Sequence, residues 1–379
     1  MPMLSFWEKD TWFNNIDVCI IGSGIVGLNA ALHLKTNAPK LKILVLERGI
    51  LPSGASTKNA GFACFGSLSE ILSDLNKMPE NEVLDLIEER FLGLQLLRKT
   101  LGDEALDYKE WGGFEMFTTA QENLYERCLD LMPRLNILLK ERFKISAPIY
   151  QNAEGTNKIF GFSGVQHLIK NTLEGQIDTG KMMKALIHKV LQLGVTIIGG
   201  TEIKQWTETE VGVELETQQW GSIKAKKLII AINGFARQLL PAIDVQPGRA
   251  QVLITSEIEN LKIKGCFHFD EGYYYFRNIG KRILLGGGRN LDFKEEETYS
   301  HEVTDKIQKA LENLLSTVIL PGQSYSIEQR WSGTLGLGQI KKPIIQAVGK
   351  HSICAVRMGG MGVAIGSLVG KKAAKLLIS

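Results

Sequence analysis

The sequence predicts an α/β fold in which a mainly parallel sheet is interleaved with a second domain built on an antiparallel or mixed sheet. Three observations carry this prediction. Near the N-terminus short apolar runs alternate with helical stretches, residues 251–286 hold several strand signals with only turns between them, and residues 344–379 return to strands followed by a helix. Strands separated by helices form parallel sheets, whereas strands joined by turns pair antiparallel.

The first elements form a βαβ unit. The run IDVCII at 16–21 is typical of a buried strand, a glycine-rich turn and a helical stretch follow it as far as Pro39, and KILVLE at 42–47 is a second buried strand. A strand, a helix and a strand within about thirty residues predict two parallel neighbours in one sheet.

An interruption follows. Residues 82–101 are typical of an amphipathic helix, because apolar side chains such as Val83, Ile87 and Leu94 recur at three- and four-residue steps. We expect a second helix at 125–143, interrupted near Pro133. Between these helices we expect a strand at 113–119.

From residue 178 strands and helices alternate again, and the strand signals at 251–286 then indicate antiparallel pairing. Helices are expected at 181–193, at 303–315 and after residue 362. Strands are expected at 195–198, 211–216, 227–232, 251–256, 266–269, 273–277, 282–286, 344–348 and 353–356. The chain then crosses between two domains several times. We expect a first domain of residues 1–80, 150–240 and 330–379, and a second of residues 81–149 and 241–329.

The composition is that of an ordinary globular protein. Of the 379 residues, 44% are hydrophobic and 22% are charged, and the net charge is +3. These values exclude a disordered chain, a fibrous repeat and a coiled coil. So small a charge gives no reason to expect nucleic acid or a membrane surface as a partner. Glycine, with 39 residues, is in excess, which indicates backbone that approaches something closely.

The cysteines and the N-terminus bear on the compartment. No C-x-x-C pair or zinc spacing joins the cysteines, so we expect buried free thiols and no metal site. They are Cys19, Cys64, Cys128, Cys266 and Cys354. No apolar run reaches the ~18 residues of a membrane span, and residues 1–15 lack the apolar core of a secretory signal. We therefore expect a soluble, cytoplasmic protein.

A dinucleotide-binding motif lies between the first strand and the first long helix. Gly22, Gly24 and Gly27 make a G-x-G-x-x-G pattern that allows a tight turn, close approach to a pyrophosphate and close helix packing. Glu47 ends the second strand, where an acid accepts hydrogen bonds from an adenosine ribose and disfavours NADP. Together these features predict a Rossmann-type domain.

Two further segments bear on the choice between NAD and FAD. The loop SGASTKNAGF at 53–62 is small and polar enough to follow a longer ligand, although an ordinary surface loop explains it equally well. The segment MGGMGV at 358–363 opens the last helix, whose N-terminus would stabilise negative charge on a reduced isoalloxazine. Close helix packing is the alternative for this segment. An NAD enzyme has no obvious use for it.

With these motifs the chain resembles the D-amino-acid-oxidase-like flavoproteins, the group of glycine oxidase, sarcosine oxidase and gamma-glutamylputrescine oxidoreductase. The resemblance covers nearly the whole chain. It rests on SFWE at 5–8, GAS at 54–56 with Asn59 and Gly61, AING at 231–234, QPGRAQ at 246–251, YFR at 275–277 with GGGR at 286–289, and WSG at 331–333 with PII at 343–345.

The resemblance implies an FAD-binding first domain and a substrate-binding second domain. It implies that the C–N bond of a small amine or amino acid is oxidised by hydride transfer to flavin N5, that water hydrolyses the imine, and that O2 or an electron-transfer acceptor reoxidises the flavin. The residues expected to bind FAD are Gly22, Gly24, Gly27, Glu47, Arg48, Ser56, Asn59, Ala60, Gly61, Ile203, Asn233, Gly234, Gly360, Met361, Gly362 and Val363.

The chain departs from the family pattern at two places. Residues 334–342 contain no Cys and residues 54–62 no His, so we expect non-covalent FAD. Leu335 stands where glycine oxidase-like members place an arginine for the substrate carboxylate, which favours an amine or a modified amino acid unless Arg277 or Arg289 takes over.

Tyr274, Arg277 and His268 are the candidate catalytic residues. Tyr273, Tyr274 and Tyr275 lie on a predicted strand, where Tyr274 or its neighbours would line the pocket and bind an amine or, as the alternative, pack in the core. His268 lies between two phenylalanines and is either a pocket residue or a structural one. Lys58 would assist oxygen reduction or contact phosphate or solvent. Two other functions stay open: a flavoprotein with a role in RNA modification or assembly, and an NAD-dependent dehydrogenase.

Overall fold

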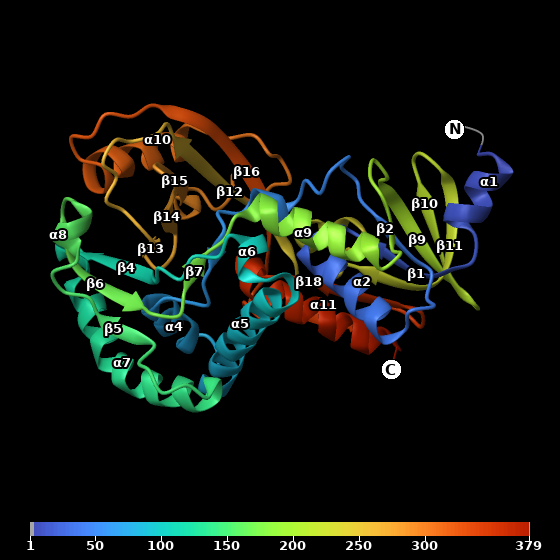
Figure 1. Ribbon diagram of the computed structural model, residues 1–379, viewed down its shortest axis with the longest axis horizontal. Helices are drawn as coiled ribbons and strands as arrows, with labels where there is room; N and C mark the ends of the chain where they lie inside the picture. The colour runs from blue at the N-terminus through green and yellow to red at the C-terminus, as the bar shows by residue number, and fades with distance from the viewer. Residues whose placement is uncertain (1–3, 379) are drawn as a thin grey trace.

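The computed structural model describes residues 4–378, which form two large sheets at the two ends of an elongated molecule (Figure 1). The first sheet contains, in spatial order, β17 (Ile344–Ala347), β18 (Ser352–Val356), β11 (Gly221–Ile230), β1 (Ile16–Ile21), β2 (Ile43–Leu46) and β8 (Thr196–Ile198). The long strand β11 also pairs with β10 (Gly212–Thr217), which pairs with β9 (Ile203–Thr209).

The second sheet is mixed. Its strands are, in spatial order, β16 (Ile327–Leu337), β12 (Gln246–Thr255), β15 (Arg282–Gly287), β14 (Tyr274–Ile279), β13 (Cys266–Phe269), β4 (Gly113–Thr118), β6 (Val165–Asn171) and β5 (Tyr150–Asn152). Most neighbours are antiparallel, but β13 and β4 are parallel. A short pair of strands, β3 (Phe62–Ala63) and β7 (Gly175–Gln176), lies between the two large sheets.

The helices cover the two sheets separately. Around the first sheet lie α2 (Ile25–Asn37), α5 (Glu80–Leu101), α9 (Thr179–Gln192) and α11 (Gly362–Ile378), and around the second lie α4 (Leu68–Leu75), α7 (Glu122–Phe143) and α10 (Asp305–Leu314). Shorter helical segments are Phe6–Glu8, Lys9–Phe13, Ala55–Lys58, Asp103–Leu106, Thr119–Gln121, Asn157–Phe160, Asn233–Gln238, Arg289–Leu291 and Leu315–Ile319. No helix within residues 4–378 is both long and apolar enough to cross a bilayer.

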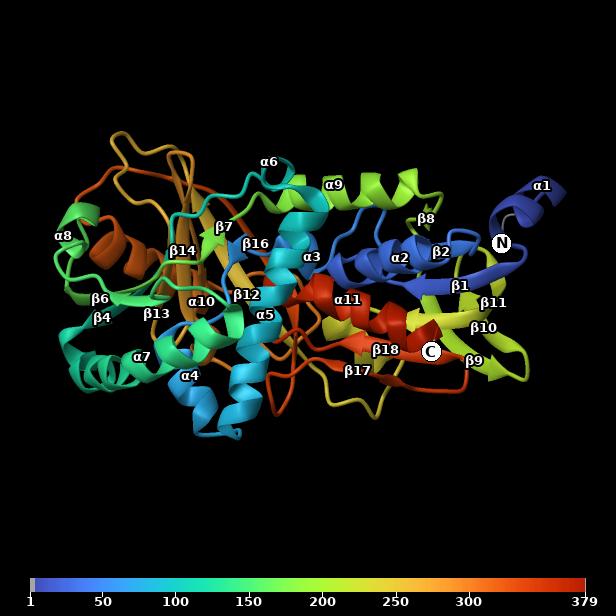
Figure 2. The same cartoon turned by 60° about the horizontal axis from the view of Figure 1, so that its bottom comes forward.

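The core of the first domain forms because its central strands are apolar on both faces. Every residue of β2 is buried, and five of the six residues of β1 are buried. Small residues let α11 approach its neighbours closely: a side chain at Gly366 would meet Ile25 of α2, and one at Gly93 of α5 would meet the backbone at Ala364. Figure 2 shows α11 beside α2, with α5 crossing near its start.

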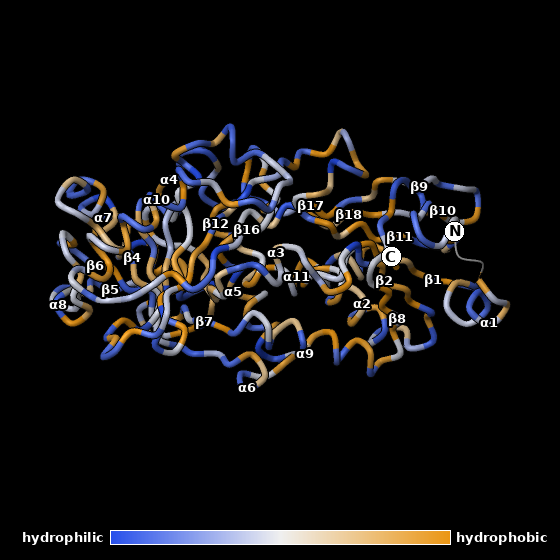
Figure 3. The backbone as a smooth tube through the Cα atoms, turned by 90° about the horizontal axis from the view of Figure 1, so that it is seen from above, coloured by the Kyte–Doolittle hydropathy of each residue, from blue (hydrophilic) through white to orange (hydrophobic). Residues whose placement is uncertain are grey.

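The two faces of the second sheet have different surroundings. One face packs on α10 through buried residues such as Phe267, Phe276 and Leu285. Because side chains alternate along a strand, His268 and Tyr275 point to the opposite face, toward the first domain. Figure 3 shows hydrophobic segments running through the strands of both domains and hydrophilic segments in many of the outer loops.

Several expectations need correction. Helix α7 continues through Pro133, because its buried residues, among them Cys128, Leu135 and Leu139, hold the helix in place despite the lost backbone hydrogen bond. The chain also crosses between sheets later than expected. Strands β5 and β6 keep residues 150–171 in the second sheet, and β16 stays there to Leu337, because their backbones complete ladders with β4 and β12.

Candidate functional site

Two pockets meet between the domains. The first pocket lies beside the glycine-rich turn after β1 and is lined by residues such as Gly22, Glu47 and Ile203. The second pocket lies on the free face of the second sheet and is lined by residues such as Tyr275 and Arg289. Both are lined by Ala55, Asn59, Leu335, Gly360 and Val363. One long ligand can therefore lie in the first pocket and present its end to the second.

The glycine-rich turn leaves backbone groups open at the start of the first pocket. Gly22 has a positive φ of 104°, and a side chain there would come within 2.7 Å of the Ala231 carbonyl oxygen. Gly24 precedes α2 and offers no side-chain cap, and a Cβ on it would lie 2.8 Å from Ser56 Oγ. Ser56 Oγ instead accepts the N–H of Ile25 at 2.9 Å. Because Gly24 adds no side chain of its own, this helix start suits a pyrophosphate.

Glu47 is held at the bottom of the same pocket. One carboxylate oxygen accepts the Ser23 N–H at 3.1 Å and the Ser23 hydroxyl at 2.8 Å, and the other accepts the Gly49 N–H at 3.0 Å. Next to it, the Arg48 guanidinium lies 4.2 Å from the centre of the Phe235 ring. Ile203 also lines this end of the pocket. The donor and acceptor set therefore fits the adenosine part of a dinucleotide.

Asn59 and Asn233 shape the junction of the two pockets. The Asn59 side chain donates to the carbonyls of Ala55 and Ser56, and its oxygen accepts the N–H of Gly61 at 2.8 Å. Asn233 has a φ of 44°, and its side-chain oxygen accepts the N–H of Met358 at 3.0 Å. These bonds fold the loop after α3 (Ala55–Lys58) and join the β11 turn to the segment before α11.

Most of the predicted cofactor residues line a pocket, but three do not. Ala60 and Met361 line the second pocket, and Gly360, Gly362 and Val363 bring the start of α11 to the site. Gly27, Gly61 and Gly234 line neither pocket. Side chains at these positions would collide with the Gly22 carbonyl, with Arg277 and with Leu335 respectively, so these glycines allow the close packing that forms the site. They do not offer a contact surface.

The second pocket combines aromatic walls with charged groups. Phe62 packs edge-on against both His268 and Tyr275, with ring centres 5.4 and 5.6 Å apart. Burial raises the pKa of Tyr275 to about 12, so its hydroxyl stays protonated at neutral pH. Tyr273 also lines the pocket. The sequence analysis left both open as pocket residues beside Tyr274, and these two are the ones that line the pocket.

The prediction that Tyr274 lines the pocket is wrong. Its ring packs with the apolar cluster beneath α10, and the centres of the Tyr274 and Phe269 rings are 6.1 Å apart. The strand alternation decides this: Tyr274 shares a face with the buried Phe276, and Tyr273 and Tyr275 take the other face.

Arg277 is buried and does not reach the pocket, which also corrects its candidate catalytic role. Its guanidinium donates to the carbonyl oxygens of Ala60 and Ile177, the latter at 3.0 Å. Burial lowers its pKa, and the carbonyls supply the partners that a buried cation needs. Arg277 therefore ties the Ala60 loop to the second sheet.

Arg289, in contrast, is free to meet a ligand. It is half-buried, lines the second pocket and lies 4.8 Å from the centre of the Phe293 ring. Within residues 4–378 its guanidinium makes no hydrogen bond or ion pair. Leu335, at the junction of the pockets, offers no charge, whereas the Arg289 guanidinium can pair with an anion bound in the second pocket.

Lys58 lies at the other side of the junction. Its ammonium nitrogen is 2.9 Å from Nδ1 of His301, whose Nε2 is 3.2 Å from the Thr334 hydroxyl. Burial and the nearby Arg48 lower the pKa of Lys58, and burial and Lys58 lower that of His301. His301 comes from a loop far away in the sequence, so no local pattern could have linked it to Lys58.

Comparison with known proteins agrees with this geometry. The family model "DAO: FAD dependent oxidoreductase" matches residues 17–376. The gamma-glutamylputrescine oxidoreductase of Escherichia coli K12 is 22% identical over 95% of this chain and 83% of its own length. The L-proline dehydrogenase of P. horikoshii (TM-score 0.75) and the glycine oxidase of Bacillus cereus (TM-score 0.73) share the fold; each is 18% identical, and the alignments cover 96% of this chain and 93% and 95% of theirs.

Proposed function

The chain belongs to the FAD dependent oxidoreductase family, and from this premise we propose that it oxidises the C–N bond of a small amine or amino acid. Membership in this family makes FAD its cofactor. This excludes the alternative of an NAD-dependent dehydrogenase. Bound FAD supplies the hydride acceptor, and water would hydrolyse the imine product.

The observation that carries the proposal is the junction of the two pockets. The first pocket offers the glycine-rich start of α2 at Gly24 and the carboxylate of Glu47, which would hold the pyrophosphate and the ribose. Its other end opens through Leu335 and Val363 into a pocket walled by Phe62, Val252 and tyrosines. These walls would exclude water and keep an amine in its neutral form.

The charged groups of the second pocket support a substrate with an anionic part. Arg289 is a half-buried cation of the pocket whose guanidinium has no hydrogen-bond or ion-pair partner among the described residues, so we propose that it binds a carboxylate of the substrate. Arg289 would then bind the carboxylate that Leu335 cannot bind. Amino acids are therefore candidate substrates as well as simple amines.

We also propose non-covalent FAD and a cytoplasmic location. Residues 334–342 have no Cys and residues 54–62 have no His to form a covalent bond to the flavin. Acid precipitation should therefore release the flavin into the supernatant. All five cysteines are buried and free, as in a reducing compartment.

Anaerobic reduction of the bound flavin tests the proposed function. Purified yellow holoprotein is mixed without oxygen with a panel of primary amines, secondary amines and L- and D-amino acids, and flavin absorbance is followed. We expect bleaching by one chemical class within this panel, and dithionite serves as the positive control. A flavin that dithionite bleaches but that no member of the panel reduces would contradict the proposal. Adding oxygen or an artificial acceptor to the reduced protein then separates an oxidase from a dehydrogenase.

A further inference from the structure

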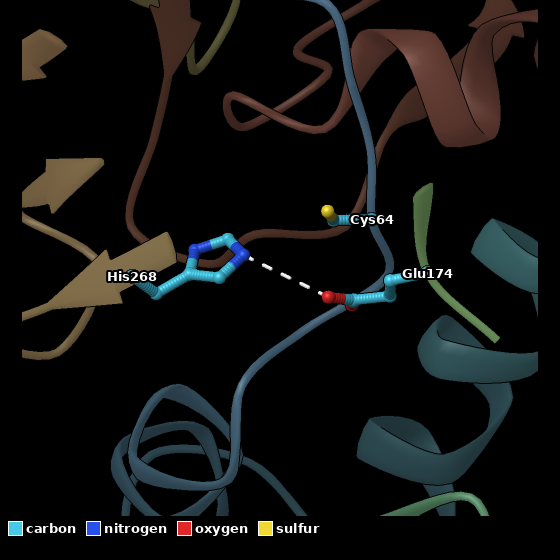
Figure 4. Close-up of side chains that lie close together, drawn as sticks. All are labelled: Cys64, Glu174 and His268. Carbon is cyan, nitrogen blue, oxygen red and sulfur yellow. Dashed lines mark ion pairs between the residues drawn. The ribbon is translucent and has the colours of Figure 1, made fainter. Parts of the chain in front are cut away.

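Three side chains from distant segments meet at the inner side of the second pocket. Cys64 follows β3, Glu174 precedes β7 and His268 lies on β13 (Figure 4). The thiol sulfur, a carboxylate oxygen and an imidazole nitrogen all lie within 4.8 Å of one another, and all three residues are buried. Cys64 and His268 also line the second pocket, so the cluster is open to a small ion.

The carboxylate is fixed with one oxygen free. One oxygen of Glu174 accepts the N–H groups of Phe65 at 2.8 Å and of Gly66 at 3.1 Å. The other oxygen faces Nε2 of His268 across 3.7 Å. The protein backbone therefore orients Glu174 toward the histidine and leaves a pair of electrons available there.

The histidine nitrogen lacks a hydrogen-bond partner. His268 is only 6% exposed, and its Nε2 has no hydrogen-bond partner among the residues that the structure describes. Its separation from Glu174 is longer than the ~2.7–3.2 Å of a hydrogen bond. A buried polar atom without a partner is costly and requires an explanation. An ion between the two side chains would supply the missing partner of both.

The distances suit a shared metal ion. Zinc binds nitrogen and oxygen at about 2.0–2.2 Å and sulfur at about 2.3 Å, so tetrahedral geometry places two ligand atoms roughly 3.3–3.6 Å apart. The 3.7 Å between His268 and Glu174 is close to this spacing. The thiol sulfur lies within 4.8 Å of the other two ligand atoms, so it needs to move inward by no more than about 1.2 Å to complete the same geometry.

The charges of the three side chains suit a divalent cation. A thiolate, a carboxylate and a neutral imidazole would together balance the two charges of a divalent ion. Thiolate and imidazole are ligands of zinc-like metals, whereas calcium and magnesium require oxygen.

We propose that Cys64, Glu174 and His268 form a binding site for one zinc-class divalent cation. Three protein ligands leave a fourth coordination position, which faces the second pocket. The proposal departs from the expectation of no metal site, which rested on cysteine spacing along the chain, whereas these ligands come from three separate segments. The proposal does not depend on the identity of the oxidised substrate.

Zinc stoichiometry of the holoprotein tests the site. Chelator-treated holoprotein is incubated with a small excess of Zn²⁺ and desalted, and metal, flavin and protein are measured. We expect about one zinc per chain for the wild type and less than about a tenth of that for Cys64→Ala and for His268→Ala. Cys128→Ala is the matched control, because it removes another fully buried thiol on α7, far along the chain, and should keep the zinc. Flavin content reports that each variant is folded.

A second measurement covers variants that do not fold. The wild-type holoprotein is loaded with ¹¹³Cd²⁺, and its NMR signal should show one thiolate among nitrogen and oxygen ligands. A wild type that retains no zinc would overturn the proposal. So would a ¹¹³Cd signal without sulfur ligation, or zinc retained equally by Cys64→Ala and His268→Ala. None of these outcomes depends on turnover, so they leave the proposed oxidation to be judged by flavin reduction alone.

Discussion

The two pockets are built in different ways. The first is shaped mostly by backbone: Gly22 and Gly24 open the turn, and Glu47 stands at the end of the next strand. The second is shaped by side chains from strands and loops far apart in the chain, among them Phe62, His268 and Arg289. Backbone requirements appear as local motifs, whereas a constellation of side chains exists only after the strands have paired.

The largest effect of a single substitution should come from a glycine next to the first pocket. Gly27→Ala places a Cβ against the Gly22 carbonyl oxygen, where neither backbone segment can yield. We expect loss of bound FAD and of most folded protein, measured by flavin absorbance per chain and by circular dichroism. Gly180→Ala, in the first turn of α9, has no such backbone neighbour and should keep its flavin. Normal flavin content in Gly27→Ala would show that the helix need not lie so close.

Around the second pocket, substitution of Arg277 should cost the most stability. Arg277→Ala leaves the buried carbonyl oxygens of Ala60 and Ile177 without a donor. We expect a loss of about 2–4 kcal/mol in the free energy of unfolding, measured by urea denaturation. Arg277→Lys should recover part of the loss because it keeps a donor. Unchanged stability with abolished turnover would instead place Arg277 in the pocket.

Arg289 should show the opposite behaviour. It has no bond to lose within the described residues, so Arg289→Met should change stability little. It should reduce kcat/KM about 10- to 100-fold for substrates with a carboxylate, since a charged hydrogen bond contributes ~1.5–3 kcal/mol. Amines without a carboxylate should be much less affected. An equal loss for both classes would mean that Arg289 does not recognise the anion.

A weaker effect is expected at Glu47. Glu47→Gln keeps one acceptor oxygen, so it should weaken FAD retention by only ~1.5 kcal/mol, about tenfold. Titration of the apoprotein with FAD, followed by quenching of flavin fluorescence, measures this. Ser23→Ala, which removes only the hydroxyl bond to Glu47, should have a smaller effect. Unchanged affinity in Glu47→Gln would show that this acid does not hold the ribose.

The sequence predicted much of the first pocket because the features that shape it lie close together along the chain. The strands at 16–21 and 43–46, the glycine turn and Glu47 all lie within about thirty residues. The sequence predicted less of the second pocket and of the sheet that carries it. Strand β6 joins polar to apolar residues without a clear alternation, and its place is decided by pairing with β4. The meeting of Cys64, Glu174 and His268 likewise depends on long-range packing.

The smallest expected effect separates the two faces of one strand. Tyr274 packs toward α10, so Tyr274→Phe should change the rate of anaerobic flavin reduction by less than about twofold. The matched change Tyr275→Phe removes a hydroxyl from the wall of the second pocket and should have a clearly larger effect on the same rate. The two substitutions are chemically identical and lie one residue apart. If Tyr274→Phe were the more damaging of the pair, the strand would present its other face to the substrate, and the assignment of Tyr273, Tyr275 and His268 to the pocket would fail with it.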